Sequence, residues 1–168
     1  MNKIVGFTGI QTGMNDFQKG EFLKLLDKFR PVDFHHGDCI GSDAEAHFMF
    51  LRWHLKNNDC TRIVTIHPPV NKGKAACTFY TVNYPDALKQ ELATAKYKVN
   101  IQLREPAQYL ARNQDIVREV EVLIATPKEV EHTLRSGTWT TIRYGWHARK
   151  EVHIIPPLMI TNDETNHE

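Results

Sequence analysis

The chain of 168 residues has few cysteines, no long apolar run and almost no excess charge. Its three cysteines, Cys39, Cys60 and Cys77, show no CxxC spacing, which argues against a zinc ribbon or a disulfide framework and favours reduced thiols. No stretch approaches the ~20 apolar residues that cross a bilayer, and the apolar start, MNKIVGFTG, is too short for a signal peptide. We therefore expect a cytoplasmic protein with no membrane partner.

The charge and the spacing of metal-binding residue types exclude further classes of protein. A net charge of +1 gives no global attraction for nucleic acid, so a nucleic-acid site would have to be a local patch, and we do not favour one. Asp43 and His47 lie one helical turn apart, near His35 and His36, but HExxH and Cys/His spacings are absent. A local hydrogen bond explains such a pair better than a metal, and we expect neither a metal nor a cofactor.

What the sequence does contain is a regular alternation of apolar runs and helical patterns. Apolar runs at 3–8, 32–36, 62–67, 98–101, 120–126 and 152–155 predict strands, and helical spacing predicts helices between them, including one that opens at Glu105-Pro106. The pair Asn15 and Gln18 indicates a helix cap, as do Ser42 and Glu45. This order predicts an α/β fold: one doubly wound Rossmann-like domain over residues 1–157, with a mostly parallel sheet and helices on both faces.

Two segments depart from the alternation. Residues 68–98 are irregular apart from a weak helical stretch near 86–95, and an insertion of this length is typical of a binding loop or a lid that closes over a site. Lys72, Lys74 or Tyr80 could then touch a ligand. Residues 158–168 are expected to be a polar C-terminal tail.

Glycines and polar residues follow the predicted strands, where ligands bind in open parallel sheets. The first loop offers Gly9, Gln11, Thr12 and Gly13, and the second offers Gly37, Asp38, Gly41, Ser42 and Asp43. Glycines let the backbone approach an anion, and carboxylates suit ribose hydroxyls. The alternative for the first loop is a simple tight turn, and for Ser42 it is helix capping alone.

The segment after the fifth strand completes the candidate site. Pro127 ends that strand, and Arg135, Ser136, Gly137 and Thr138 place a cation, hydroxyls and backbone N–H groups at the start of a helix. On the preceding helix, Arg112 could pair with a phosphate and Asn113 falls on the apolar stripe, whereas the alternative is a surface arginine and a loop-bonding asparagine. Three such loops at one sheet edge favour phosphate binding.

Several of these motifs together resemble the SLOG superfamily, which includes the DNA-processing protein A (Smf) group and the "lonely guy" phosphoribohydrolases. The resemblance is carried by RNQDIV at 112–117, VLIATP at 122–127, Ser-Gly-Thr at 136–138, IIPP at 154–157, and HG at 36–37 followed by GSDAEAH at 41–47. It implies nucleotide binding, an arginine (Arg112) at the ribose phosphate, and a homodimer. The phosphoribohydrolase motif PGGxGTxxE is not kept, because KEVEHTLR follows Pro127 and Thr141 stands at the place of the catalytic glutamate.

The sequence therefore predicts a stand-alone domain that binds a nucleotide or another phosphorylated ribose compound, for example a nucleotide signal. The first alternative is a hydrolase or transferase acting on an N-glycosidic bond, with Asp38, Asp43 or Glu129 as a displaced acid. The second is single-stranded DNA binding, with tryptophan and tyrosine as stacking platforms. Whether the chain is an enzyme is left open by the sequence.

Overall fold

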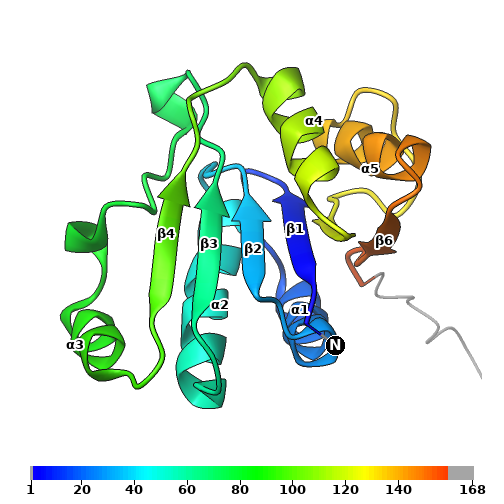
Figure 1. Cartoon of the computed structure of the whole chain (residues 1–168). Coiled ribbons are helices and arrows are strands. Elements are labelled where there is room, and N and C mark those ends of the chain that lie inside the picture. Colours follow the sequence, from blue (N-terminus) through cyan, green and yellow to red (C-terminus); the bar gives the residue numbers. More distant parts are fainter. Residues whose placement is uncertain (1, 159–168) are drawn as a thin grey trace, which may run out of the picture.

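Strands and helices alternate along the chain to build one parallel sheet (Figure 1). The computed structural model describes residues 2–158, in which the strand order is β4-β3-β2-β1-β5-β6. Every neighbouring pair is parallel, as the α/β expectation required. The strands are β1 (Ile4–Gly9), β2 (Asp33–His36), β3 (Arg62–Ile66), β4 (Val99–Leu103), β5 (Val122–Thr126) and β6 (Glu151–Ile154). The α-helices are α1 (Asp16–Phe29), α2 (Ser42–Asn57), α3 (Asp86–Thr94), α4 (Tyr109–Glu119) and α5 (Gly137–His147).

The alternation of side chains along β1 shows how the two faces of the sheet are covered. Val5 and Phe7 belong to the main core, together with the buried faces of α1 and α2, and Phe7 packs edge-on against Phe22. Gly6 points the other way, and a Cβ there would lie 3.1 Å from side-chain atoms of Ile116 and Val120. The missing side chain therefore lets α4 pack closely on β1. Helices cover both faces of the sheet, as in a doubly wound fold.

The order of the strands reverses between β1 and β5. From β1 the chain moves outward through β2, β3 and β4, then returns through α4 to β5 and continues outward to β6. All strands run in the same direction, so the loops that follow β1 and β5 leave the sheet next to each other. Such a switch point is where ligands bind in open α/β sheets.

Of the two helix caps that the sequence predicted, one forms and the other does not. Asn15 and Gln18 form both hydrogen bonds of a capping box at α1, as expected. The second predicted cap is wrong: Gly41 precedes α2, and the Ser42 hydroxyl is buried with no hydrogen-bond partner. Glu45 instead accepts from the Met14 backbone N–H at 2.6 Å, because the loop after β1 packs against this end of α2.

Helix α4 also begins later than the proline suggested. Its first helical residue is Tyr109, not Pro106. The cause is tertiary: Ala107 forms a parallel bridge with Pro69, in which its backbone N–H donates to Pro68 and its carbonyl accepts from Val70. These bonds hold residues 105–107 extended and delay the helix.

The insertion at 68–98 is more ordered than its composition indicated. It contains two 3-10 helices, η1 (Lys72–Lys74) and η2 (Thr81–Asn83), and α3. Tyr84 and Leu88 are buried against the main core. A movable lid over the site would therefore have to exclude the part of the insertion around these two residues.

Two further expectations concern membranes and the tail. Within residues 2–158, no helix combines the length and apolar character that a bilayer crossing requires. The predicted polar tail at 158–168 lies outside the described residues from 159 onward.

Candidate functional site

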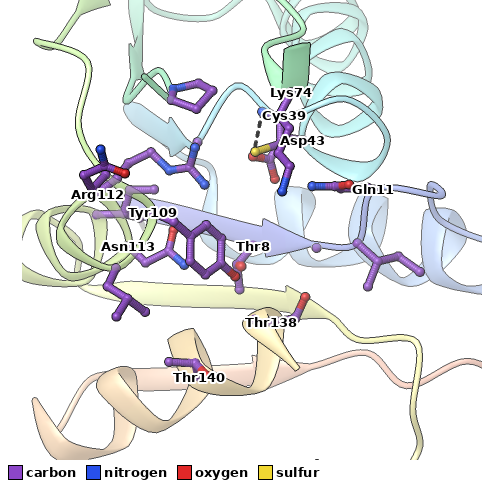
Figure 2. A pocket seen from close by; sticks show the side chains of 18 of the residues that line it. Thr8, Gln11, Cys39, Asp43, Lys74, Tyr109, Arg112, Asn113, Thr138 and Thr140 are labelled. Carbon is purple, nitrogen blue, oxygen red and sulfur yellow. Dashed lines mark hydrogen bonds between the residues drawn. The ribbon is translucent and has the colours of Figure 1, made fainter. Parts of the chain in front are cut away.

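A cavity of about 680 Å³ opens at the carboxyl end of the sheet, at the switch point between β1 and β5. Its volume falls within the ordinary range for small-molecule sites. The loop after β1, the start of α2, the first part of the insertion, α4 and the start of α5 all contribute to it (Figure 2). Its polar side chains include Thr8, Gln11, Cys39, Asp43, Asn71, Lys74, Gln108, Tyr109, Arg112, Asn113, Arg135, Ser136, Thr138 and Thr140.

Arg112 is the most unusual side chain of this cavity. It is only 3% exposed, yet within residues 2–158 no carboxylate pairs with it, and its Nε atom is buried with no hydrogen-bond partner. The ring of Tyr109 covers one side of the guanidinium, 5.3 Å from its central carbon. Gly37 makes room on another side, because a Cβ there would lie 3.1 Å from Nε. A buried cation normally has an anionic partner, so the unpartnered Nε is a donor that an anion could use.

Asp43 is the carboxylate that faces the same cavity. Its Oδ2 accepts from the backbone N–H of Cys39 at 3.2 Å, and the Gly37 backbone contributes a second hydrogen bond. Burial raises the pKa of the Asp43 carboxyl to about 6, although these bonds and the charge of Arg112 act to lower it. Figure 2 shows Arg112 pointing toward the side of the cavity on which Asp43 and Cys39 lie. Near neutral pH, Asp43 can therefore accept hydrogen bonds or, in its protonated fraction, give up a proton.

The N-terminus of α5 forms the opposite wall, with Thr138 and Thr140 below Tyr109 in Figure 2. Ser136 is the cap, and its hydroxyl accepts from the backbone N–H of Trp139 at 3.4 Å. Within the described part of the chain, nothing accepts from the backbone N–H groups of Gly137 and Thr138. These two donors lie at the positive end of an 11-residue helix, which is a favourable place for an anion.

Asn113 fixes the position of this wall relative to α4. Its side-chain amide donates to the Thr141 hydroxyl at 2.8 Å, and that hydroxyl donates to the Gly137 carbonyl at 3.1 Å. A Cβ on Gly137 would lie 1.7 Å from the Tyr109 hydroxyl oxygen, so the tyrosine sits directly against the start of α5. The polar residue on the apolar stripe of α4 is thus explained by a buried link between two helices.

The loop after β2 was expected to cradle phosphate, but four of its backbone N–H groups and the Asp38 carboxylate already have partners in the protein. The backbone N–H groups of Asp38, Cys39, Ile40 and Ser42 all bind protein acceptors. The Asp38 carboxylate accepts from the backbone N–H groups of Cys77 and Thr78 and from the Thr78 hydroxyl, so it holds the insertion in place. Burial raises its pKa despite these bonds. From this loop, Gly37, Cys39 and Asp43 line the cavity.

Of the sixteen residues predicted for the site, ten line the cavity: Gly9, Gln11, Gly37, Asp43, Arg112, Asn113, Arg135, Ser136, Gly137 and Thr138. The other six, Thr12, Gly13, Asp38, Gly41, Ser42 and Pro127, do not line it.

Besides Asp38, three of those six have clear structural tasks. Gly41 takes a positive φ of 88° and lies so close to the Gln11 backbone that a Cβ would be 2.2 Å from its carbonyl oxygen. The Pro127 carbonyl accepts from the buried Gln18 side chain at 2.9 Å. The Gly13 backbone N–H donates to the Ile10 carbonyl within the turn.

Sequence reasoning did not assign Thr8, Cys39, Tyr109 or Gln108 to the site. Tyr109 lies one helical turn before Arg112, a spacing that could have indicated a shared face. From the insertion, Lys74 lines the cavity, as suggested, whereas Lys72 and Tyr80 do not. No local pattern distinguishes these cases, because the path of the insertion depends on tertiary contacts.

Neither a scan against protein-family models nor a search of curated proteins finds a match for the chain.

Proposed function

We propose that the cavity at the switch point binds a nucleotide or another small molecule that carries a phosphorylated ribose. The observation that carries this proposal is Arg112, a buried guanidinium with unused donors and no acidic partner within residues 2–158. A phosphate would satisfy these donors with charge-assisted hydrogen bonds, and Arg is suited to bind it through two of them. The resemblance of the sequence to the SLOG superfamily leads to the same class of ligand.

The remaining groups of the cavity fit the rest of such a ligand. The free backbone N–H groups of Gly137 and Thr138 suit additional phosphate oxygens, with the exposed cations Lys74 and Arg135 at the rim. Asp43, when ionised, is an acceptor for ribose hydroxyls. The half-exposed ring of Tyr109 offers aromatic surface to a base. Binding of this kind needs no catalytic group and is compatible with a role in sensing a nucleotide signal.

A second function, cleavage of an N-glycosidic bond in a bound nucleotide, is favoured by one observation. Among the three acids considered as replacements for the missing catalytic glutamate, Asp43 lines the cavity and Asp38 and Glu129 do not. Burial raises the pKa of Asp43 to about 6, which leaves a protonated fraction that could donate to a leaving base. This acid stands on α2, not at position 141, which is occupied by a buried threonine bonded to Asn113.

The experiment is a thermal-shift screen of the purified protein against nucleoside mono-, di- and triphosphates, dinucleotides, cyclic nucleotides and ribose phosphates. A ligand at a hundred times its dissociation constant should stabilise the protein by about 2.7 kcal/mol, which gives a readily measured shift. Mass spectrometry of each mixture then shows the state of the ligand. The matching nucleosides without phosphate are the control, and they should give little or no shift.

Recovery of the intact ligand after a shift supports binding without chemistry. A shift accompanied by free base supports the second function, and Asp43→Asn should then abolish the release of base. If no phosphorylated compound shifts the melting temperature, or if nucleosides shift it equally, the phosphate site is wrong. Salt-sensitive binding to single-stranded oligonucleotides would then become the next hypothesis to examine.

A further inference from the structure

Two buried histidines meet on the face of the sheet that α4 partly covers, and neither of them lines the cavity. His35 lies on β2, and His67 directly follows β3, its neighbour in the sheet. The His35 Nδ1 and His67 Nε2 atoms are 3.0 Å apart, and the two side chains are 2% and 3% exposed. Glu119, at the end of α4, places Oε2 3.9 Å from the same His35 nitrogen. Among residues 2–158, these three form the group of side chains that could hold a metal ion.

The hydrogen bonds around His35 determine which of its nitrogens carries the lone pair. Its Nε2 atom is 3.2 Å from Asp33 Oδ2, and the other oxygen of Asp33 accepts from the Thr65 hydroxyl at 2.8 Å. Asp33 accepts at this position, so the His35 ring carries its proton on Nε2. The lone pair on Nδ1 therefore points at His67 and Glu119.

A metal-binding histidine usually donates its second ring N–H to a carboxylate, which fixes the tautomer and the orientation of the ring. Asp33 stands in this relation to His35. The facing His67 Nε2 donates its proton to the His35 Nδ1 lone pair. To bind a cation through Nε2, the His67 ring has to move this proton to Nδ1.

We propose that His35 Nδ1, His67 Nε2 and Glu119 bind a divalent transition-metal ion of the zinc type. Two nitrogens and one carboxylate oxygen are a ligand set that zinc accepts, with water in the fourth position. Zinc–nitrogen bonds of about 2.0–2.1 Å in a tetrahedral site place the ligand atoms about 3.3 Å apart. The 3.0 Å and 3.9 Å separations lie on either side of that value, so rotations of the side chains suffice.

One competing contact involves Arg104, whose Nη2 atom donates to Glu119 Oε2 at 2.5 Å. Both side chains of this ion pair are more than one-third exposed, so the pair contributes little to stability. The second oxygen of Glu119 can keep the arginine when the first binds the ion. Metal binding would also tie the last turn of α4 to β2 and β3, and the same helix carries Arg112 at the cavity.

The test is calorimetric titration of Zn²⁺ into the protein after treatment with a chelator, without any nucleotide. We expect one ion per chain, at least tenfold weaker binding for Glu119→Gln and His67→Gln, and a loss of about tenfold or more for Asp33→Asn. Glu119 is partly exposed, so its variant leaves the two buried histidines in place. The matched control is His153→Gln, which removes another histidine–carboxylate contact, to Glu151, and should bind as wild type.

Nitrogen NMR of the histidine rings gives a second readout. On addition of Zn²⁺, the His67 proton should move from Nε2 to Nδ1, while the His35 proton stays on Nε2. The proposal is overturned if the wild type binds no stoichiometric ion, if Glu119→Gln binds equally tightly, or if the His67 tautomer does not change. Because no nucleotide is present, these outcomes leave the cavity proposal untouched.

Discussion

At the scale of single residues, the cavity combines two ionisable groups that stability alone would not favour. Arg112 is buried without an acidic partner among the described residues, and Asp43 has a carboxyl whose pKa burial raises to about 6. They lie on the same side of the cavity, but no ion pair within 4.0 Å joins them. Such unsatisfied groups are usually retained where a ligand completes them, and they carry a measurable cost in the free protein.

Asp43→Asn tests that cost. The carboxyl has a pKa of about 6 in the folded protein against 3.8 when unperturbed, so its contribution to stability is full below pH 3.8 and is lost as the pH rises through about 6. The amide keeps an acceptor for the backbone N–H of Cys39 and removes the buried charge. We expect the variant to be more stable than wild type at pH 8, by about 3 kcal/mol, with the difference shrinking as the pH falls from 6 toward 4.

Urea unfolding at a series of pH values measures this difference. Asp86→Asn is the matched control, because Asp86 is an exposed acid in the first turn of α3. Its effect should be small and should show no comparable dependence on pH. Equal stability of Asp43→Asn and wild type at pH 8 would mean that the carboxyl is not destabilising.

At the scale of elements, a buried chain of hydrogen bonds joins β2, α2 and the insertion. The Asp38 backbone N–H donates to His36 Nδ1 at 3.0 Å, so the other nitrogen of that ring carries the proton and donates to His47 Nδ1 at 3.0 Å. His47 Nε2 then donates to the Tyr84 hydroxyl at 2.7 Å, which donates to the Thr78 carbonyl at 2.8 Å. Burial lowers the pKa of His47 to about 3 and that of His36 well below its ordinary value, so both rings are neutral.

Tyr84→Phe interrupts this chain at one hydroxyl. The His47 N–H and the Thr78 carbonyl would lose their partner in a buried environment, and we expect a loss of about 1–3 kcal/mol in the free energy of unfolding. Denaturant unfolding at pH 7 provides the measurement. Tyr80→Phe makes the same chemical change on a ring that is 53% exposed, and it should change stability by less than about 0.5 kcal/mol. If the two variants are equally stable, the chain does not anchor the insertion.

At the scale of the whole molecule, local patterns were sufficient to predict the architecture. The α/β class and the parallel sheet follow from apolar runs that alternate with helical spacing, and β5, which is buried along its whole length, is the clearest of these runs. The predicted starts of α2 and α4 were wrong because tertiary contacts, and not the local sequence, fix where these helices begin. Glu45 binds the loop after β1 instead of completing a cap, and the bridge between Ala107 and Pro69 delays α4.

The candidate site was predictable only in part for the same reason. Glycine-rich loops and an N-terminal helix turn are visible in the sequence, but whether their donors are free depends on distant partners. In the loop after β2, the N–H groups of Ile40 and Ser42 bind carbonyls of distant segments, whereas those of Gly137 and Thr138 have no acceptor among the described residues. His35, His67 and Glu119 are far apart in the sequence, so no spacing rule could have revealed that they meet.

The central claim is that Arg112 anchors the phosphate of a nucleotide-type ligand. Its most direct test is calorimetric titration of the best ligand from the screen into wild type, Arg112→Gln and Arg118→Gln. Arg118 lies on the same helix but is exposed and paired with Asp115. Loss of a hydrogen-bonded charge should weaken binding by roughly tenfold to a hundredfold for Arg112→Gln, with Arg118→Gln unchanged. Equal affinity of wild type and a folded Arg112→Gln protein would contradict the account.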